Sequence, residues 1–331
     1  MKKRISILVA GISVLALLLA GCGGSSKTES SSNPEQAAPK KKSVALVVQA
    51  LNQDYWYLVA AGAQAAAKKN GVDLVVMGPK AETDVEQQYA MIEDQITKGV
   101  SALVIAPDQP GSIGPVLDKA KAANIPVALV DTDAPWKDKV SFVGTGNVAA
   151  GKEAGKFVAG KLKKGDKVAI VRGPMGDPTH DQRIQGFKEA VEAQGIQVVS
   201  DQPANSERGL ATSVMENTLQ SNPDIKAVFA TNDEMAMGCY QALKAANKSN
   251  IIVVGLDGSP DALKSILEDG VAATAAQQPY EMGFQGVEAA LKAVDGQSVS
   301  KNIDTGTILV TKENAAERLK LLDEYLKSYP H

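Results

Sequence analysis

The feature that most constrains the fold is a regular alternation of short apolar runs with longer stretches of helical period. The runs are rich in β-branched residues, and we predict strands at 44–48, 73–77, 102–105, 126–130, 141–143, 167–171, 197–199, 227–230, 251–256 and 272–276. The stretches between them predict helices, as at 55–70, 85–98 and 179–194. Continuously apolar strands separated by helices are typical of parallel sheets covered on both faces. The sequence therefore predicts an α/β fold with doubly wound parallel sheets.

The chain also repeats itself on the scale of a domain. The letters Lys-Ala-Ala-Asn at 121–124 precede an apolar run that ends before Asp131, and the same letters at 244–247 precede a run that ends before Asp257. A second pair of similar segments occurs upstream, one before each of these two runs, so the repeats appear in the same order. The spacing is far longer than the repeat of a solenoid. We therefore predict two similarly built parallel-sheet lobes.

The N-terminus has the pattern of an export signal. A basic start at 2–4 is followed by an apolar run at 5–20, which is too short for a comfortable membrane span. The small residues before Cys22 resemble the lipobox of bacterial lipoproteins, in which the cysteine becomes the new N-terminus and carries acyl chains. We predict a signal peptide at 1–21 and lipidation at Cys22. An ordinary signal with an incidental cysteine is the alternative, and both place the protein outside the cytoplasm.

Composition narrows the function further. Residues 22–42 contain almost no large apolar side chain, which predicts a flexible tether. A net charge of -3 gives no basic face for nucleic acid. Once Cys22 is assigned to lipid, Cys239 has no partner, and its apolar helical setting predicts a small buried side chain.

Polar residues follow the predicted strands, where ligands of open parallel sheets bind. They include Gln49, Gln53, Asp108, Asp131, Thr132, Asn232, Asp257 and Gln277, with Arg183 just after a loop. Charged groups make strong hydrogen bonds to hydroxyls, and the adjacent Tyr55 and Trp56 suit the C–H faces of a sugar ring. A single aspartate here is usually a helix cap, and a single aromatic is usually core. The joint pattern favours a hydroxyl-rich ligand.

These positions carry a resemblance over residues 43–311. Val-Gln-Ala-Leu-Asn at 48–52, Gly-Phe at 186–187, Asn-Asp-Glu-Met-Ala at 232–236 and Gly-Leu-Asp-Gly at 255–258 resemble periplasmic sugar-binding proteins of the ribose-binding type. The resemblance implies a type I periplasmic binding protein fold, in which two lobes joined by a three-segment hinge close over one monosaccharide. It also implies delivery to the membrane subunits of an ABC importer.

The resemblance implies the following ligand-binding set, to which we add Gln49 and Thr132: Gln53, Tyr55, Trp56, Asp131, Arg183, Asn232, Asp257 and Gln277. Four positions depart from the ribose pattern. Gln49 stands where serine is usual, Ala106 replaces asparagine, Thr132 replaces arginine and Ser206 replaces phenylalanine. The changes at 132 and 206 should make room. A hexose, a polyol or a modified sugar is therefore as well supported as ribose.

The lobes are expected at 43–145 plus 278–305 and at 146–277 plus 306–331. We expect a monomer without a cofactor or metal. The sequence lacks the Gly-x-Ser-x-Gly elbow of a hydrolase, and the loop at 144–151 lacks the third glycine of a dinucleotide site, so Asn147 is interpreted as a helix cap. His180 is expected to be solvated at a helix start.

The function predicted from the sequence is capture of a monosaccharide or polyol for an ABC importer. The alternative is a sensory module of the same fold that docks on a chemoreceptor or histidine kinase, with a furanosyl signal as its ligand. A sugar-modifying enzyme is disfavoured. The sequence does not distinguish one sugar or anomer from another, and it does not identify the membrane that carries the anchor.

Overall fold

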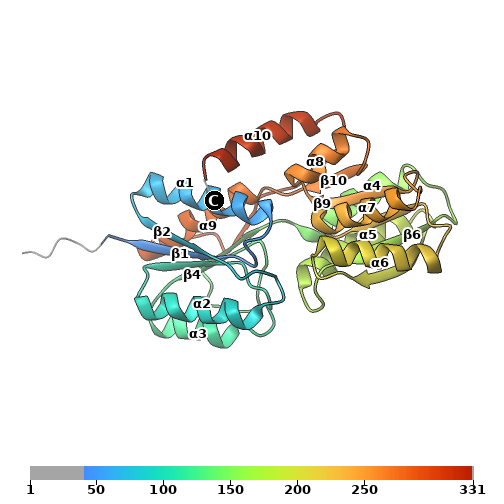
Figure 1. Cartoon of the computed structure of the whole chain (residues 1–331). Coiled ribbons are helices and arrows are strands. Elements are labelled where there is room, and N and C mark those ends of the chain that lie inside the picture. Colours follow the sequence, from blue (N-terminus) through green and yellow to red (C-terminus); the bar gives the residue numbers. More distant parts are fainter. Residues whose placement is uncertain (1–40, 330–331) are drawn as a thin grey trace, which may run out of the picture. The chain divides into compact units, whose positions relative to one another are not determined.

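The computed structural model describes residues 41–329, which form two parallel-dominated sheets (Figure 1). The first sheet has the order β11-β5-β4-β3-β1-β2 and the second has the order β12-β10-β9-β8-β6-β7. These two sheets, with helices between their strands, confirm the predicted α/β class. The predicted signal peptide, Cys22 and nearly all of the predicted tether lie outside the described residues. No helix within residues 41–329 is long and apolar enough to cross a membrane.

Each sheet is a run of short strands with parallel pairing. The first contains β1 (Ser43–Val47), β2 (Asp73–Met77), β3 (Ala102–Ile105), β4 (Val127–Val130), β5 (Ser141–Gly144) and β11 (Asn302–Asp304). The second contains β6 (Lys167–Arg172), β7 (Gln197–Pro203), β8 (Ala227–Ala230), β9 (Ile252–Asp257), β10 (Ala273–Ala276) and β12 (Ile308–Val310). The β10–β12 pair is antiparallel. Central strands such as β3 and β8 are fully buried, as covered parallel strands should be.

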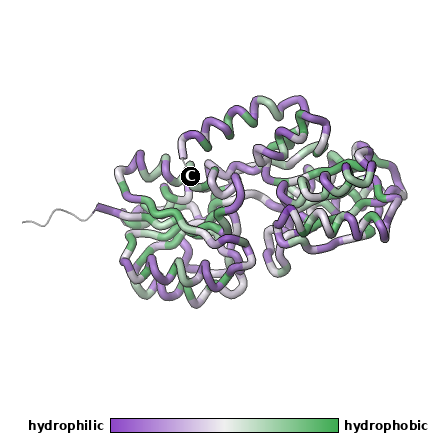
Figure 2. Tube along the Cα trace, viewed as in Figure 1, coloured by the Kyte–Doolittle hydropathy of each residue, from purple (hydrophilic) through white to green (hydrophobic). Residues whose placement is uncertain are grey.

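Helices cover both faces of each sheet. They are α1 (Asp54–Asn70), α2 (Val85–Lys98), α3 (Gly114–Ala122), α4 (Asn147–Ala159), α5 (Pro178–Glu192), α6 (Arg208–Ser221), α7 (Asp233–Ala245), α8 (Pro260–Leu267), α9 (Pro279–Val294) and α10 (Ala315–Lys327). In the first sheet, α1 and α9 pack on one face, and α2 and α3 pack on the other (Figure 1). In the second, α4 and α5 oppose α6 and α7. Figure 2 shows hydrophobic residues concentrated on the strands and hydrophilic residues on the outer helix surfaces.

The chain passes between the two sheets along three described segments. The first joins β5 to α4, the second joins β10 to α9, and the third joins β11 to β12. Helix α10 contacts the second of these segments. Arg318 of α10 donates to the Gln277 carbonyl at 2.7 Å and to the Gln278 side chain at 3.0 Å, and Tyr325 stacks on Tyr280 with ring centroids 3.8 Å apart. The C-terminal helix therefore holds the β10–α9 crossing.

Helices α4 and α5 approach so closely that their backbones touch at glycines. A Cβ atom on Gly151 would lie 1.9 Å from the Arg183 carbonyl oxygen, and one on Gly186 would lie 1.9 Å from the Val148 carbonyl oxygen. No real Cβ tolerates such a contact with backbone, so both positions require glycine. The close packing fixes the helix that carries Arg183.

We expect Gly186→Ala to lower the free energy of unfolding by about 1–3 kcal/mol or more, because the new methyl forces α4 and α5 apart. Urea unfolding followed by circular dichroism measures the change. Gly209→Ala is the matched control, because a Cβ there meets open space in α6, and its stability should stay equal or rise slightly. Equal losses in both variants would contradict the close approach.

Candidate functional site

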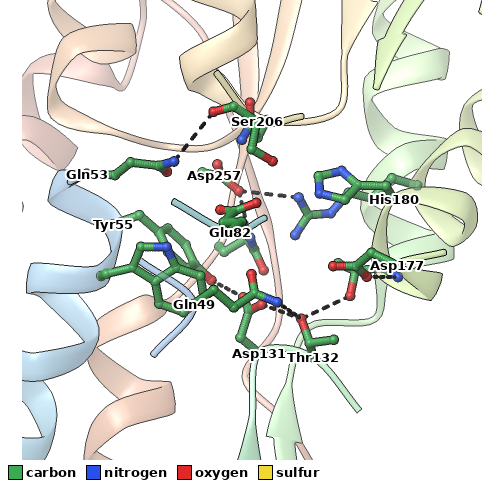
Figure 3. Close-up of a pocket in the computed structure, with 15 residues that line it drawn as sticks. Gln49, Gln53, Tyr55, Glu82, Asp131, Thr132, Asp177, His180, Ser206 and Asp257 are labelled. Carbon is green, nitrogen blue, oxygen red and sulfur yellow. Dashed lines mark hydrogen bonds and ion pairs between the residues drawn. The ribbon is translucent and has the colours of Figure 1, made fainter. Parts of the chain in front are cut away.

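A pocket lies where the carboxyl ends of strands from both sheets face one another (Figure 3). The predicted ligand-binding residues all line it: Gln49, Gln53, Tyr55, Trp56, Asp131, Thr132, Arg183, Asn232, Asp257 and Gln277. The structure adds Glu82, Asp177, Thr179, His180 and Ser206 to the lining. The structure therefore places the residues predicted from strand ends and from the family resemblance around one pocket, while their role toward a ligand stays a prediction.

Asp131 is held by hydroxyl groups on both carboxylate oxygens. It follows β4 with a φ of 62°, a left-handed conformation that aspartate tolerates better than most residues. The Tyr55 hydroxyl donates to Oδ1 at 2.5 Å, and the Thr132 hydroxyl donates to Oδ2 at 2.8 Å. Gln49 Nε2 in turn lies 3.3 Å from the Thr132 hydroxyl oxygen. These contacts orient the carboxylate and leave further lone pairs on it for a ligand.

Asp257 ends β9 in a strained conformation, with a φ of 133°. Gln277 Nε2 donates to its Oδ1 at 2.7 Å, and Arg183 Nη1 lies 3.6 Å from the same oxygen. Burial raises the pKa of Asp257 well above its usual range; the Arg183 guanidinium opposes this shift, and the neighbouring Asp233 adds to it. The Asp233 backbone N–H donates to the other carboxylate oxygen, Oδ2, over a long 3.4 Å, so the carboxyl group can still accept from a ligand.

Arg183 is 4% exposed, and two hydrogen bonds from different nitrogens hold its guanidinium. Its Nε donates to Asn147 Oδ1 at 2.9 Å, and its Nη1 donates to the Thr231 carbonyl at 2.8 Å. These bonds leave Nη2 available to a ligand. The interpretation of Asn147 as a helix cap was wrong: Gly146 is the N-cap of α4, and the Asn147 side chain turns toward Arg183 instead.

His180 also differs from its prediction, because it is buried in the pocket wall rather than solvated. Its Nδ1 lies 2.8 Å from the Thr231 hydroxyl. Burial lowers its pKa well below the usual value, and the positive charges of Arg183 and Arg172 lower it further, so the ring is neutral. The imidazole packs over Gly173, where a Cβ would lie 2.2 Å from Nε2. The burial of His180 depends on this tertiary contact, which the sequence pattern did not indicate.

Three buried polar atoms of the pocket residues have no hydrogen-bond partner among residues 41–329. They are Trp56 Nε1, Ser206 Oγ and Gln277 Oε1. An unsatisfied buried polar group costs about 1–3 kcal/mol, so native structures normally provide a partner. Trp56 Nε1 requires an acceptor and Gln277 Oε1 requires a donor. A ligand with several hydroxyl groups supplies both.

The free space between these side chains is about 20 Å³, which holds a water molecule but not a sugar ring. The expectation that Thr132 and Ser206 leave extra room is therefore not met here, because Glu82 reaches into the middle of the pocket (Figure 3). Two contacts bring the walls together across the pocket. Gln53 Nε2 donates to the Ser206 carbonyl at 3.5 Å, and the hydroxyls of Thr132 and Thr179 are 3.2 Å apart. A ligand can enter only when these walls separate.

Other candidates fall outside this site. Asp108 follows β3 and is buried away from the pocket lining, and burial raises its pKa to about 9. Cys239 is fully buried with a pKa raised by burial to about 12, which confirms its prediction as an inert apolar side chain. Within residues 41–329, no group of three histidine, cysteine or acidic side chains has the arrangement of a metal site.

The chain is similar to known binding proteins along most of its length. Residues 44–298 match the family described as periplasmic binding protein domain. The chain is similar to the ribose import binding protein RbsB of Escherichia coli K12, with 38% identity over 276 residues, 83% of this chain and 93% of that protein. It is 36% identical to RbsB of Bacillus subtilis over 314 residues, 95% of this chain and 100% of that one.

Solved structures of solute-binding proteins are also similar to this chain. A periplasmic solute-binding protein from Actinobacillus succinogenes with bound D-allose superposes with a TM-score of 0.79 at 29% identity, covering 84% of this chain and 100% of that one. A carbohydrate transporter solute-binding protein from Agrobacterium radiobacter, in complex with D-arabinose, has a TM-score of 0.81 at 30% identity and covers 86% and 99% of the two chains.

Tyr55→Phe removes the hydroxyl that donates to Asp131, and we expect it to lower the free energy of unfolding by about 1–3 kcal/mol because the acceptor is a buried carboxylate. Urea unfolding measures the loss. Tyr240→Phe is the control, because no hydroxyl partner of Tyr240 is present among the described residues. A loss no larger in Tyr55→Phe than in Tyr240→Phe would show that the Asp131 contact does not orient the pocket.

Proposed function

The chain belongs to the periplasmic binding protein domain family, and from this premise we propose that it captures one monosaccharide or polyol and delivers it to an ABC importer. The observation that carries the proposal is the convergence of carboxylates, a guanidinium and unpartnered buried polar atoms on one small pocket. The ribose import proteins and the structures with bound D-allose and D-arabinose support a monosaccharide as ligand. The family is one of binding proteins, so we assign no reaction to the pocket.

The pocket offers complementary groups to a ring of hydroxyls. Asp131 and Asp257 accept hydrogen bonds, and Arg183 Nη2 donates one. Asn232 uses its Oδ1 to cap α7 at Met235 N, so its Nδ2 remains free to donate. Because an adjacent pair of sugar hydroxyls can both donate and accept, each of these groups gains a partner at once. Charge assistance makes these bonds strong when water is excluded.

Binding is coupled to closure of two lobes, 43–145 plus 278–305 and 146–277 plus 306–331. The three segments between the sheets form the hinge, and closure brings Thr132 against Thr179. A ligand that contacts both lobes stabilises the closed form by the difference between its affinities for the two forms. Importer recognition then requires only that the closed form be the one that docks.

The protein works outside the cytoplasm as a tethered monomer. The family supports the extracytoplasmic location. The signal at 1–21, lipidation at Cys22 and the tether at 22–42 are inferred from the sequence pattern. More than one acyl chain on Cys22 would keep the protein at the membrane that carries the importer, because one chain alone holds only marginally.

We expect one or more sugars in a screen of pentoses, hexoses and polyols to raise the melting temperature, because a ligand that binds only the folded state stabilises it. Arg183→Ala and Asp257→Ala should each weaken binding of that sugar by about 2–5 kcal/mol, because each leaves buried charged partners unpaired. Titration calorimetry measures the affinities. Asp224→Ala, at an exposed ion pair with Lys167, is the matched control and should bind normally. Unchanged affinity in both pocket variants would remove this pocket as the binding site.

Deletion of the gene tests delivery to an importer. Uptake of the identified radiolabelled sugar at micromolar concentration should be lost and should return with a plasmid copy of the gene, because the importer then receives its cargo. A plasmid copy carrying Asp257→Ala is the control and should restore little uptake. Intact uptake together with a lost response to the sugar would instead favour the sensory alternative.

A further inference from the structure

Glu82 is a pocket residue that the strand-end pattern did not reveal. It lies in the connection between β2 and α2, is 9% exposed and lines the pocket. Figure 3 shows its carboxyl group in the middle of the ring of side chains, between Gln49 and Asp257. Ser206, which follows β7 in the second sheet, stands beside this carboxyl group. Glu82 therefore reaches from the first sheet toward a residue of the second.

Burial of the Glu82 carboxyl group costs free energy unless the group gains a hydrogen-bonding or charged partner. Glu82 takes part in no ion pair among residues 41–329, and burying a carboxyl group without a basic partner costs free energy. Burial raises the pKa of Glu82 to about 8. The Ser206 side chain opposes this shift by hydrogen bonding, the negative charges of Asp177 and Asp131 add to it, and Arg183 opposes it. A buried titratable group in a ligand pocket is a functional candidate on physical grounds.

We propose that Glu82 is a specificity-determining residue, whose carboxyl group hydrogen-bonds a hydroxyl of the bound sugar or polyol and links that hydroxyl to Ser206 across the pocket. The proposal rests on the function proposed above and deepens it. Ser206 stands close enough to the Glu82 carboxyl group to lower its pKa, but its Oγ makes no well-directed hydrogen bond among residues 41–329. A ligand hydroxyl that enters when the walls separate can bond to both groups.

This geometry selects a class of ligand. At neutral pH the protonated carboxyl group of Glu82 can donate one hydrogen bond and accept others, which matches a hydroxyl. A carboxylate or phosphate on the sugar would instead meet Asp177, Asp131 and Asp257 around it. The pocket should therefore bind neutral sugars or polyols and reject uronic acids and sugar phosphates.

The contact also makes binding depend on pH in a definite direction. The groups that face Glu82 are Ser206, Asp177, Asp131 and Arg183, and Asp108 lies near enough for Glu82 to raise its pKa. Above about pH 8, Glu82 loses the proton that it donates and adds a negative charge beside the aspartates. Because the complex holds that proton, affinity should fall as pH rises through this value.

Glutamine is the neutral isostere of the protonated side chain, which makes E82Q the key variant. Calorimetry with a panel of D-ribose, D-allose, D-galactose, xylitol and D-glucuronate should compare wild type, E82Q, E82A and the control E86Q. Glu86 is the second residue of α2, four positions after Glu82, and is exposed. For the neutral panel member that binds best at pH 7, E82A should lose about thirtyfold in affinity because its partners become unsatisfied. E82Q and E86Q should stay within about threefold of wild type, because each keeps the donor and acceptor groups of the pocket.

The pH series separates a ligand contact from simple filling of space. Between pH 7 and pH 9 wild type should lose about tenfold in affinity, whereas E82Q should stay nearly flat. A fall that E82Q shares would point to Asp108 and overturn the role of Glu82. E82A should melt at the same temperature as wild type or higher, because it removes a buried carboxyl group. Its weak binding could not then be explained by misfolding.

Other outcomes would overturn the assignment. If E82A binds as well as wild type or more tightly, Glu82 only fills the pocket. If D-glucuronate binds best, the charge argument is wrong. If no panel member binds wild type, the proposed function fails and the role of Glu82 fails with it, whereas binding that ignores E82A but is lost in Asp257→Ala would remove Glu82 alone.

Discussion

Desolvation of acidic side chains is the constraint on which the site depends. Asp257, Glu82 and Asp177 are all removed from water, and burial is the largest cause of the raised pKa of each. Among the residues that line the pocket, the one guanidinium is that of Arg183, and its Nη1 lies 3.6 Å from Asp257 Oδ1 as an ion pair. Carboxyl groups that are buried with few donors lose their hydrogen bonds to water, so the pocket without ligand carries an unfavourable free energy. Hydroxyl donors release that free energy, which is why a sugar or polyol would favour closure.

The regular backbone of the two sheets positions the acidic side chains and Arg183 of the pocket. Parallel strands present their carboxyl ends at one edge of a sheet, so Asp131 after β4 and Asp257 after β9 arrive at corresponding places in the two sheets. The contact between α4 and α5 through Gly151 and Gly186 then fixes the helix that carries Arg183. Alanine at either position would move the guanidinium by displacing its helix. The glycines thus serve the pocket although they do not line it.

Sequence reasoning succeeded where side-chain position follows from secondary structure. Alternating apolar runs gave the sheets, and strand ends gave Asp131, Asp257 and Gln277, because the direction of a buried strand fixes where the next residue points. The three-residue strands β11 and β12 were not predicted, because they are partly exposed and too short for a periodic signal. Glu82 and His180 were missed or misplaced because their positions depend on tertiary contacts: a loop folded into the cavity, and a ring packed over Gly173.

The departures from the ribose pattern make sense when they are considered together. Thr132 and Ser206 are smaller than the arginine and phenylalanine usual there, and Glu82 occupies space in the same pocket. One exchange removes a cation, and Glu82 supplies a carboxyl group whose pKa is raised enough to keep it neutral, so hydrogen-bonding capacity is kept without adding a charge at neutral pH. On the proposal made above, a ribose-type scaffold altered in this way would recognise hydroxyls through an uncharged group that both donates and accepts. Selectivity would then depend on the protonation state of one side chain, which burial in the pocket maintains.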